Sequence, residues 1–347
     1  MARIFYGVMG DARGHVNRAL TIVKEMPEHE FLFFGGGRVL DLVQEGYQVE
    51  EAPMPSTFYR GDSVDLPATI LNAVKVFMGR RGVIDRAADI IKDFDPDLVL
   101  TDYEFFTPLA ARKLGRTCVS VDHQHVLTHC AYKTPPEQLL SRMMTNFSVR
   151  HLYSNASLFV VISFFQIPAV DPTVTAVLPP VIRRMVTEYK PTLGDHVLVY
   201  QTSPTFHRTI PVLEELEDRF IIYGAGEQPS RKNLQFKKPA QHGFLADLAS
   251  ARYVITNGGH NVISEALYLG KPVLSFPIVN AYEQFINAWF LARMEYGDYS
   301  TSPTPGKRVF DEFQSRLHIF RAGIEQGTFF GNEILARKLQ KLVNGGI

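Results

Sequence analysis

A glycine-rich turn in the second half of the chain has the residue types that bind a diphosphate. The apolar run 251–256 predicts a buried strand, and residues 262–269 carry apolar side chains at the spacing of a helix with one buried face. Gly258 and Gly259 lie in the turn between them. Such a turn places backbone N–H groups and the positive end of a helix at one point. It therefore predicts phosphate binding, with a tight connection of no further function as the alternative.

Two groups of polar residues extend this candidate site toward a sugar. Glu265 follows Asn261 by one helical turn, so the two side chains share a helix face. A carboxylate there can accept hydrogen bonds from both hydroxyls of a ribose. Glu283 and Gln284 open the next predicted helix, after a second buried strand over 271–277. Because this connection neighbours the first, we expect the pair to project into the same crevice.

The spacing of these residues resembles the donor-site signature of the GT-B glycosyltransferases, and most closely that of the UDP-glycosyltransferase superfamily and the related peptidoglycan N-acetylglucosaminyltransferase group. The matching positions are Gly258-Gly259, Asn261, Glu265, Gly270-Lys271-Pro272, Pro277, Glu283-Gln284 and Asn287-Ala288. Plant and animal members carry a His before the first glycine, which contacts the phosphates, whereas this chain has Asn257. The resemblance implies a donor site that includes Asn257, Gly258, Gly259, His260, Asn261, Glu265, Glu283 and Gln284.

Further donor contacts are implied earlier in the same half of the chain. Thr202 and Ser203 follow a predicted strand over 197–200, at a turn that faces the diphosphate in the resembling family. Phe244 precedes a helix expected over 246–251, where this fold holds the nucleobase. The resemblance implies that the Phe244 ring flanks the base.

Strands alternate with helices throughout, which predicts parallel sheets of the α/β class, and 347 residues suggest two domains. The resemblance implies a GT-B fold, in which two Rossmann-like domains face each other across a cleft. We expect an acceptor-binding domain over 1–180 and a nucleotide-sugar-binding domain over 181–330. A last helix over 331–347 should cross back to the first domain.

A candidate base lies at the carboxyl end of the first predicted strand. His15 stands at a helix start, where a side chain points into the cleft of such a fold. Gly14-His15 with Arg18 resembles the G-H-x-x-R of many GT-B enzymes, in which this His deprotonates the acceptor hydroxyl. Asp102 ends another predicted strand, at the position where the family holds the Asp that orients the His. The resemblance thus implies a His15–Asp102 dyad with Arg18 near the acceptor.

The loop after the strand 118–121 is a second candidate for acceptor contacts. It carries Asp122, His123 and His125, and Asp122 is the alternative partner for His15. On an extended segment both histidines would face one side, as a metal site requires, but no further ligand at standard spacing accompanies them. Asp93 and Asp95 lie before a strand, at the amino end of the sheet, away from where such folds bind ligands. We therefore expect no metal and no cofactor besides the nucleotide sugar as co-substrate.

The expected reaction is metal-independent transfer of a sugar from a nucleoside diphosphate, with UDP preferred, to a hydroxyl. Retaining GT-B enzymes often carry Glu-x7-Glu, and the first Glu would fall on Asn257, so inversion is expected. One alternative is a non-hydrolysing UDP-sugar 2-epimerase, which shares the fold and the donor site. The other is a nucleotide-sugar-binding protein without catalysis.

Composition restricts the partners and the compartment. Lys and Arg together number 36, as do Asp and Glu, so no overall charge attracts nucleic acid. Two cysteines, no signal peptide and no long apolar run predict a cytoplasmic protein. The amphipathic segment 67–79 with Arg80 and Arg81 offers two interpretations: packing on its own sheet, or contact with a lipid acceptor at the inner face of a membrane. The sequence does not predict the oligomeric state.

Overall fold

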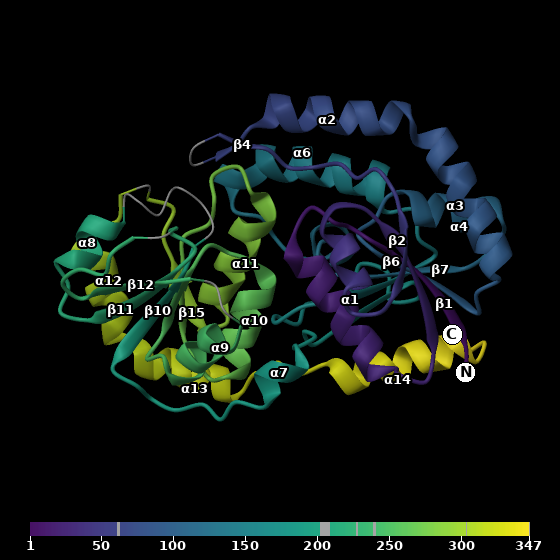
Figure 1. Ribbon diagram of the computed structural model, residues 1–347. Helices are drawn as coiled ribbons and strands as arrows, with labels where there is room; N and C mark the ends of the chain where they lie inside the picture. The colour runs from purple at the N-terminus through teal and green to yellow at the C-terminus, as the bar shows by residue number, and fades with distance from the viewer. Residues whose placement is uncertain (61–62, 202–208, 227, 239–240, 303, 347) are drawn as a thin grey trace. The chain divides into compact units, whose positions relative to one another are not determined.

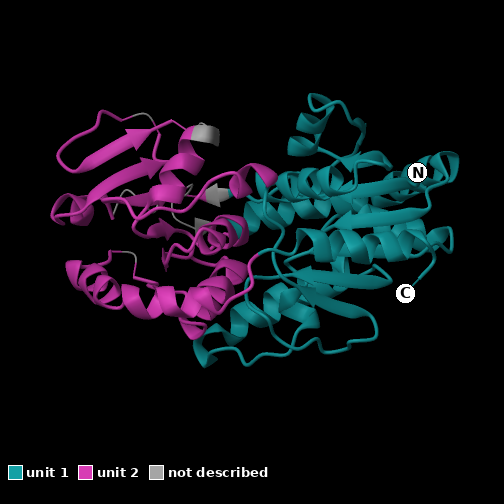
Figure 2. Cartoon of the chain, turned by 90° about the horizontal axis from the view of Figure 1, so that it is seen from below, with its two compact units in different colours: residues 1–58, 65–183, 330–347 teal, residues 59–64, 184–329 magenta. Residues whose placement is uncertain are grey.

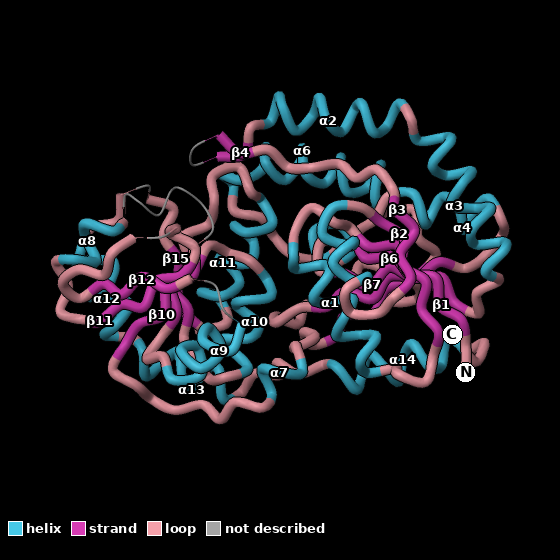
Figure 3. Tube along the Cα trace, in the orientation of Figure 1, coloured by secondary structure: helices cyan, strands magenta, loops and turns pink. Residues whose placement is uncertain are grey.

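The computed structural model describes residues 1–60, 63–201, 209–226, 228–238, 241–302 and 304–346. The chain forms two compact units, which Figure 2 colours separately. Unit 1 comprises Met1–Phe58, Asp65–Arg183 and Phe330–Ile347, and unit 2 comprises Tyr59–Val64 and Arg184–Phe329. Each unit contains one parallel sheet with helices packed on it (Figures 1 and 3).

The sheet of unit 1 has seven strands in the order β3-β2-β1-β6-β7-β8-β9. Their bounds are β1 Arg3–Val8, β2 Glu30–Gly35, β3 Gln48–Glu51, β6 Leu98–Asp102, β7 Cys118–Asp122, β8 Leu158–Ile162 and β9 Thr175–Leu178. All six neighbouring pairs are parallel. The central strands are buried along nearly their whole length, which explains why they read as continuous apolar runs rather than as alternating ones.

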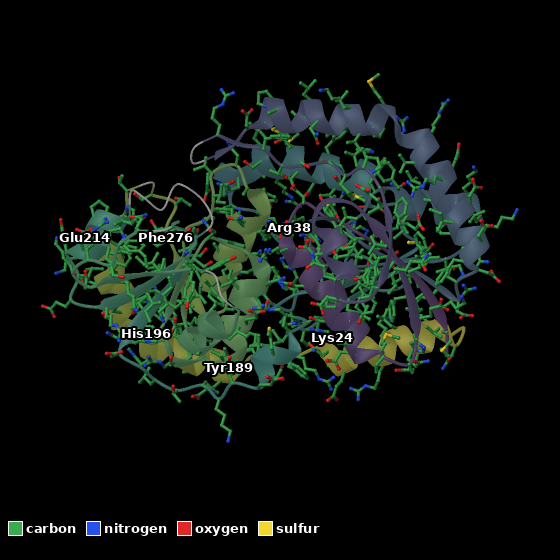
Figure 4. The ribbon with its side chains drawn as sticks, viewed as in Figure 1. Lys24, Arg38, Tyr189, His196, Glu214 and Phe276 are labelled. Carbon is green, nitrogen blue, oxygen red and sulfur yellow. The ribbon has the colours of Figure 1, made fainter. Side chains whose placement is uncertain are left out.

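Helices cover both faces of this sheet. They are α1 Arg13–Glu25, α2 Leu66–Met78, α3 Arg80–Phe94, α4 Phe106–Lys113, α5 Val126–His129, α6 Leu139–Ser148 and α14 Asn332–Val343, with short 3-10 turns over Gly37–Val43 and Pro136–Gln138 and a π turn over Val149–Tyr153. One apolar core joins the sheet to α1 and α14, and the other joins it to α3 and α4. The outer side of α1 is polar, and Lys24 near its C-terminal end is exposed (Figure 4).

The helix α14 belongs to unit 1 although it follows unit 2 in the chain. Leu335 and Leu339 are part of the core that α1 shares with the sheet. Asn332 at the start of α14 fastens the return, because its amide accepts from Ile182 N and donates to Ile182 O, both at 2.8 Å. The same amide nitrogen donates to Glu25 at the end of α1 at 3.1 Å.

The sheet of unit 2 has six parallel strands in the order β12-β11-β10-β13-β14-β15. They are β10 His196–Tyr200, β11 Arg219–Tyr223, β12 Leu234–Lys237, β13 Val254–Thr256, β14 Val273–Ser275 and β15 Gly297–Tyr299. The helices are α7 Arg184–Thr187, α8 Ile210–Glu214, α9 Gln241–Ser250, α10 His260–Tyr268, α11 Tyr282–Arg293, α12 Lys307–Ser315 and α13 Leu317–Glu325. A two-stranded pair, β4 Tyr59–Arg60 and β5 Ser63–Val64, is counted with this unit.

The prediction of two Rossmann-like domains with parallel sheets is confirmed, but two edge strands were missed. β9 is only four residues long, and β15 begins with Gly297, which has low strand propensity. The glycine is required there by a close approach, because a Cβ on it would lie 1.9 Å from Val273 O on the adjacent strand. In the described part of the chain, no helix has both the length and the apolar character needed to cross a bilayer.

Candidate functional site

The first candidate site lies where two neighbouring strands of unit 1 end. β1 and β6 run parallel, with Val8 opposite Asp102, and Met9 N donates to Asp102 O at 3.1 Å. The chain leaves β1 through a four-residue connection and enters α1 at Arg13, so His15 lies in the first turn of this helix. The register of the two strands thus places the last residue of β6 beside the start of α1.

Three side chains meet at this point. Nδ1 of His15 lies 2.7 Å from Oδ1 of Asp102, and the Asp102 carboxylate has no exposed surface. Arg18 donates two hydrogen bonds to the same carboxylate, from Nε to Oδ2 at 2.7 Å and from Nη2 to Oδ1 at 2.6 Å. Since an ionised carboxylate can only accept, the short contact to His15 requires a proton on Nδ1. This tautomer leaves the lone pair on Nε2, which is the form of a general base.

The charges in this cluster are fixed by their surroundings. Burial opposes the charge on Arg18, but the Asp102 carboxylate outweighs it and raises the Arg18 pKa above its usual value. Burial, followed by the negative charge of Asp102, raises the pKa of Tyr6 on β1 well above its ordinary value. Tyr6 is therefore a neutral phenol, and the Asp102–Arg18 pair is a permanent ion pair beside the imidazole.

Tyr103 completes the surroundings of His15. It follows Asp102 directly and adopts φ = 50°, a left-handed conformation that is uncommon for an aromatic residue. Its ring lies nearly parallel to the His15 ring, at 9° and 6.2 Å between centroids, and stacks on Tyr153 at 4.1 Å. Glu104, the next residue, has a structural role, because its carboxylate accepts from the N–H groups of Phe106 and Thr107 at the start of α4. Burial raises the Glu104 pKa.

The structure differs from the sequence prediction for Arg18 and for Asp122. Arg18 does not face outward to an acceptor, because Asp102 holds its guanidinium and only 5% of the residue is exposed. Asp122 does not orient His15. Its carboxylate accepts from Nδ1 of His125 at 2.6 Å, from His125 N at 2.9 Å and from Ser120. Burial alone would raise the Asp122 pKa, but the charge and hydrogen bonds of His125 hold it below its usual range.

The two histidines of the H-x-H loop, His123 and His125, are also buried. The segment turns into α5 instead of continuing as an extended strand, so the expected common face does not form. Nδ1 of His123 is 2.9 Å from Ile162 O. His123 and His125 are each at most 1% exposed. Neither histidine has the open face that direct acceptor contact requires. Next to them, burial and then the charge of His125 lower the His129 pKa to about 4.

The second candidate site is the start of α10 in unit 2. The helix begins at His260, two residues before the predicted start, with Gly259 as its N-cap. A Cβ on Gly258 would lie 2.4 Å from Gln284 O, whereas a Cβ on Gly259 would meet nothing within 4 Å. Gly258 is therefore required by packing against α11, and Gly259 borders open space at a helix N-terminus.

Hydrogen bonds fasten this turn to the next strand and helix. Nδ2 of Asn287 on α11 donates to Gly258 O at 2.9 Å, and the Ser275 hydroxyl donates to Asn257 O at 3.0 Å. Oε1 of Gln284 accepts from Ile278 N at 3.1 Å and so shapes the loop between β14 and α11. The structure thus joins the two parts of the sequence motif into one rigid unit.

The remaining predicted donor residues differ in exposure. Asn257, His260 and Glu265 are buried, with Glu265 4% exposed. Asn261, Glu283 and Gln284 are partly exposed. Most of the surface that this motif offers to a ligand therefore comes from Gly259, Asn261 and the first turn of α11.

Phe244 lies within α9, which starts five residues before the predicted helix. Its ring packs edge-on against Tyr200 and Tyr223, both at 5.2 Å between centroids. These tyrosines are the last residues of β10 and β11, so the aromatic group marks the carboxyl ends of these strands. Thr202 and Ser203 lie outside the described residues.

The acidic pair Asp93 and Asp95 lies at the end of α3, as the sequence predicted. Asp95 takes the left-handed C-cap position with φ = 42° and forms an ion pair with Arg116. Over the residues that the structure describes, no group of three or more His, Cys, Asp or Glu side chains is arranged to hold a metal ion.

Two units, each with one parallel sheet and helices packed on it, are the architecture of the GT-B fold. A family model described as glycosyl transferase family 1 matches residues 2–318, and the chain belongs to this family. An uncharacterized glycosyltransferase of Methanosarcina mazei is 26% identical over 338 residues, covering 87% of each protein.

Solved structures share the fold at low sequence identity. Phytolacca americana UGT2, complexed with UDP-2fluoro-glucose and pterostilbene, superposes with a TM-score of 0.67 at 14% identity over 99% of both chains. MurG of Acinetobacter baumannii superposes with a TM-score of 0.62 at 17% identity, covering 98% of this chain and 100% of that one. The protein is therefore a transferase of the GT-B type.

The two glycines of the donor turn should respond differently to the same substitution. Gly258→Ala forces the backbones of the turn and α11 apart and should lower the free energy of unfolding of unit 2 by about 1–3 kcal/mol. Gly259→Ala adds a methyl group in open space at φ = −70°. The lower entropy of the unfolded chain and the poorer N-cap preference of Ala then oppose each other, so the free energy of unfolding should change by less than about 0.5 kcal/mol. Urea unfolding of both variants measures the difference, and equal effects would contradict the assignment of the two positions.

Proposed function

We propose that this enzyme transfers a sugar from a nucleoside diphosphate, with UDP preferred, to a hydroxyl group, with inversion at the anomeric carbon. The observation that carries the proposal is the His15–Asp102 contact of 2.7 Å, which leaves Nε2 as a proton acceptor. Support for the UDP donor comes from the family motif and from the UDP-sugar complex of Phytolacca americana UGT2.

The proposed reaction is a single displacement. His15 Nε2 accepts the proton of the acceptor hydroxyl, and the acceptor oxygen forms a bond to the anomeric carbon. The bond from that carbon to the diphosphate oxygen breaks, and the diphosphate leaves with the bonding electrons. Asp102 does not take the proton; it stabilises the imidazolium that forms. A single displacement, with attack on the face opposite the leaving diphosphate, inverts the anomeric carbon, and Asn257 lies where retaining enzymes carry the first Glu of their pair.

The start of α10 is the proposed site of the donor phosphates. The helix has nine residues, and its N-terminal end carries a partial positive charge. Because Gly259 has no side chain, an anion can approach the backbone closely. The helix end would stabilise the charge that develops on the leaving diphosphate, so the proposed chemistry needs no metal.

Replacing His15 tests the catalytic part of this proposal. His15→Ala should lower kcat by about 10²–10⁴-fold, the usual contribution of a general base, with the donor Kd unchanged. Turnover of a panel of nucleotide sugars with hydroxyl acceptors, and calorimetric titration with each donor, give the two quantities. NMR of the product reports the anomeric configuration. Epimerisation of the donor in the absence of acceptor, or full activity of His15→Ala, would reject the proposal in favour of a 2-epimerase or a different mechanism.

Gly259→Ala tests the donor site separately from stability. We expect a loss of affinity for UDP of about tenfold or more, equivalent to about 1.4 kcal/mol, because the methyl group occupies the space that a phosphate needs. Gly306→Ala is the matched control, since Gly306 is also the N-cap of a helix in unit 2 and a Cβ there meets nothing within 4 Å. Unchanged UDP binding by Gly259→Ala would place the phosphates elsewhere.

A second part of the proposal concerns the acceptor, which we infer to be presented at an anionic membrane surface. α2 and α6 have no buried residue, which is unusual for helices this apolar. Their exposed large apolar side chains are Leu66, Ile70, Leu71, Val74 and Met78 on α2, and Leu139, Leu140, Met143, Met144 and Phe147 on α6. Figure 1 shows both helices on the same side of unit 1.

The charges around these two helices favour a lipid surface over another apolar partner. Residues 66–81 and 139–153 contain no Asp or Glu. They carry Lys75, Arg80, Arg81, Arg142 and Arg150, although the whole chain has no net charge. Apolar side chains with basic residues beside them are typical of segments that lie in the interface of an anionic membrane.

Sedimentation with lipid vesicles tests this surface. The protein should bind phosphatidylglycerol-containing vesicles more tightly than phosphatidylcholine vesicles, and less tightly at high salt. The variant Met143→Ser with Phe147→Ser should lose about a hundredfold or more in affinity, because each of the two large side chains contributes roughly 1.5–3 kcal/mol on burial. Leu193→Ser, which changes an equally exposed side chain in unit 2, is the control and should bind normally. Absence of vesicle binding would reject the membrane surface. A concentration-dependent dimer that the α6 variant abolishes would assign these faces to a second copy of the chain.

A further inference from the structure

Arg18 is in a position to control the charge of the proposed base. Its guanidinium occupies both oxygens of Asp102, and its Nη2 lies 3.0 Å from Nδ1 of His15. All three side chains are nearly or fully buried, so water screens their interactions weakly. A carboxylate beside an imidazole favours the protonated ring, and a guanidinium at the same distance opposes it. Asp102 and Arg18 therefore act on His15 with opposite signs.

We propose that Arg18 is a positioning residue that keeps His15 an uncharged base with its proton on Nδ1. The inference rests on the proposed function of His15. Arg18 fixes the carboxylate through both oxygens, so that Oδ1 remains in line with Nδ1–H. It also offsets the negative charge that would otherwise hold a second proton on the ring. The His–Asp pair of this protein is therefore a neutral Arg–Asp–His triad.

The other groups around the triad do not replace Arg18. Tyr6 on β1 is a neutral phenol under the sheet end, and Tyr103 after β6 contributes an uncharged ring. Asp122 at the end of β7 adds a second negative charge within reach of Arg18, but its oxygens are held by His125 and Ser120. Of the contacts of His15 with Asp102, Arg18 and Tyr103, the one with Arg18 brings a permanent positive charge to the ring.

Removal of the Arg18 guanidinium should favour the protonated form of His15. Removing the guanidinium leaves Asp102 to stabilise the imidazolium alone, so a larger fraction of His15 is protonated at a given pH. The acid limb of the kcat/KM profile should then move to higher pH by about one unit or more, the usual effect of one close charge. A purely structural role for Arg18 would change stability and kcat but leave the position of the limb unchanged.

The experiment compares pH profiles of kcat/KM for the wild type and four variants. Arg18→Gln should shift the acid limb upward, and Arg18→Gln combined with Asp102→Asn should bring it back toward the wild-type position, because both charges are gone. Arg18→Lys keeps the positive charge, so the acid limb of the profile should stay at its wild-type pH. The variant loses the paired hydrogen bonds from the guanidinium to both Asp102 oxygens. Lys24→Gln removes the same charge from the exposed end of α1 and should leave the profile unchanged.

Two outcomes would overturn the inference: an unshifted limb in Arg18→Gln, or a limb in Arg18→Lys that moves as far as the Gln substitution was expected to move it. Arg18→Gln leaves a buried carboxylate with one partner fewer, which destabilises the fold. If that variant does not fold, Asp102→Asn alone and the double variant decide the question. Both lack the carboxylate, so the acid limb should lie at higher pH in the double variant, which also lacks the guanidinium, and equal limbs would overturn the inference. Failure of the base assignment is seen separately, because His15→Ala would then retain turnover whatever Arg18 does.

Discussion

The buried carboxylate of Asp102 sets the arrangement of unit 1 around the candidate active site. An ionised carboxylate without exposed surface is strongly destabilising unless charged or polar donors surround it. Here the donors are a guanidinium and an imidazole from successive turns of one helix, three residues apart. The first turns of α1 must therefore lie against the end of β6, and the connection from β1 has to be short enough to bring them there. The Asp102–Arg18 ion pair that stabilises this arrangement also sets the charge of His15, the proposed base.

The candidate site of unit 2 is formed mainly by backbone atoms, whereas that of unit 1 is formed by side chains. The turn before α10 is held by an amide from α11 and a hydroxyl from β14, both of which donate to main-chain carbonyls. Asn287, a residue of the sequence motif, thus shapes the turn. A turn held in this way keeps the N–H groups of the helix start in place without a charged side chain, which suits the proposed binding and release of a diphosphate.

Much of the fold and of the first candidate site could be predicted from the sequence, for physical reasons that differ between residues. Parallel strands end at one sheet edge, so the meeting of His15 and Asp102 follows once both are placed at strand ends. The family motif implies an acceptor role for Arg18, whereas its spacing of three residues from His15 puts both side chains on one helix face, where Asp102 can contact both. The turn of the H-x-H loop into α5 accompanies the buried Asp122–His125 contact, which the sequence pattern does not show. The difference between Gly258 and Gly259 arises from one close approach of α11 and has no signal in the sequence.

The return of α14 makes unit 1 discontinuous in the chain, and this affects the order in which the protein can form during synthesis. Leu335 and Leu339 belong to the same core as α1, which carries His15 and Arg18. The segment that ends at Arg183 leaves the ribosome 335 − 183 = 152 residues before Leu335. At typical synthesis rates this is a wait of roughly 10–30 s. During that time unit 2 is synthesised up to its last residue, Phe329, while the part of the α1 core that α14 covers stays exposed. The core of unit 1 is therefore completed only after the whole of unit 2 has been made.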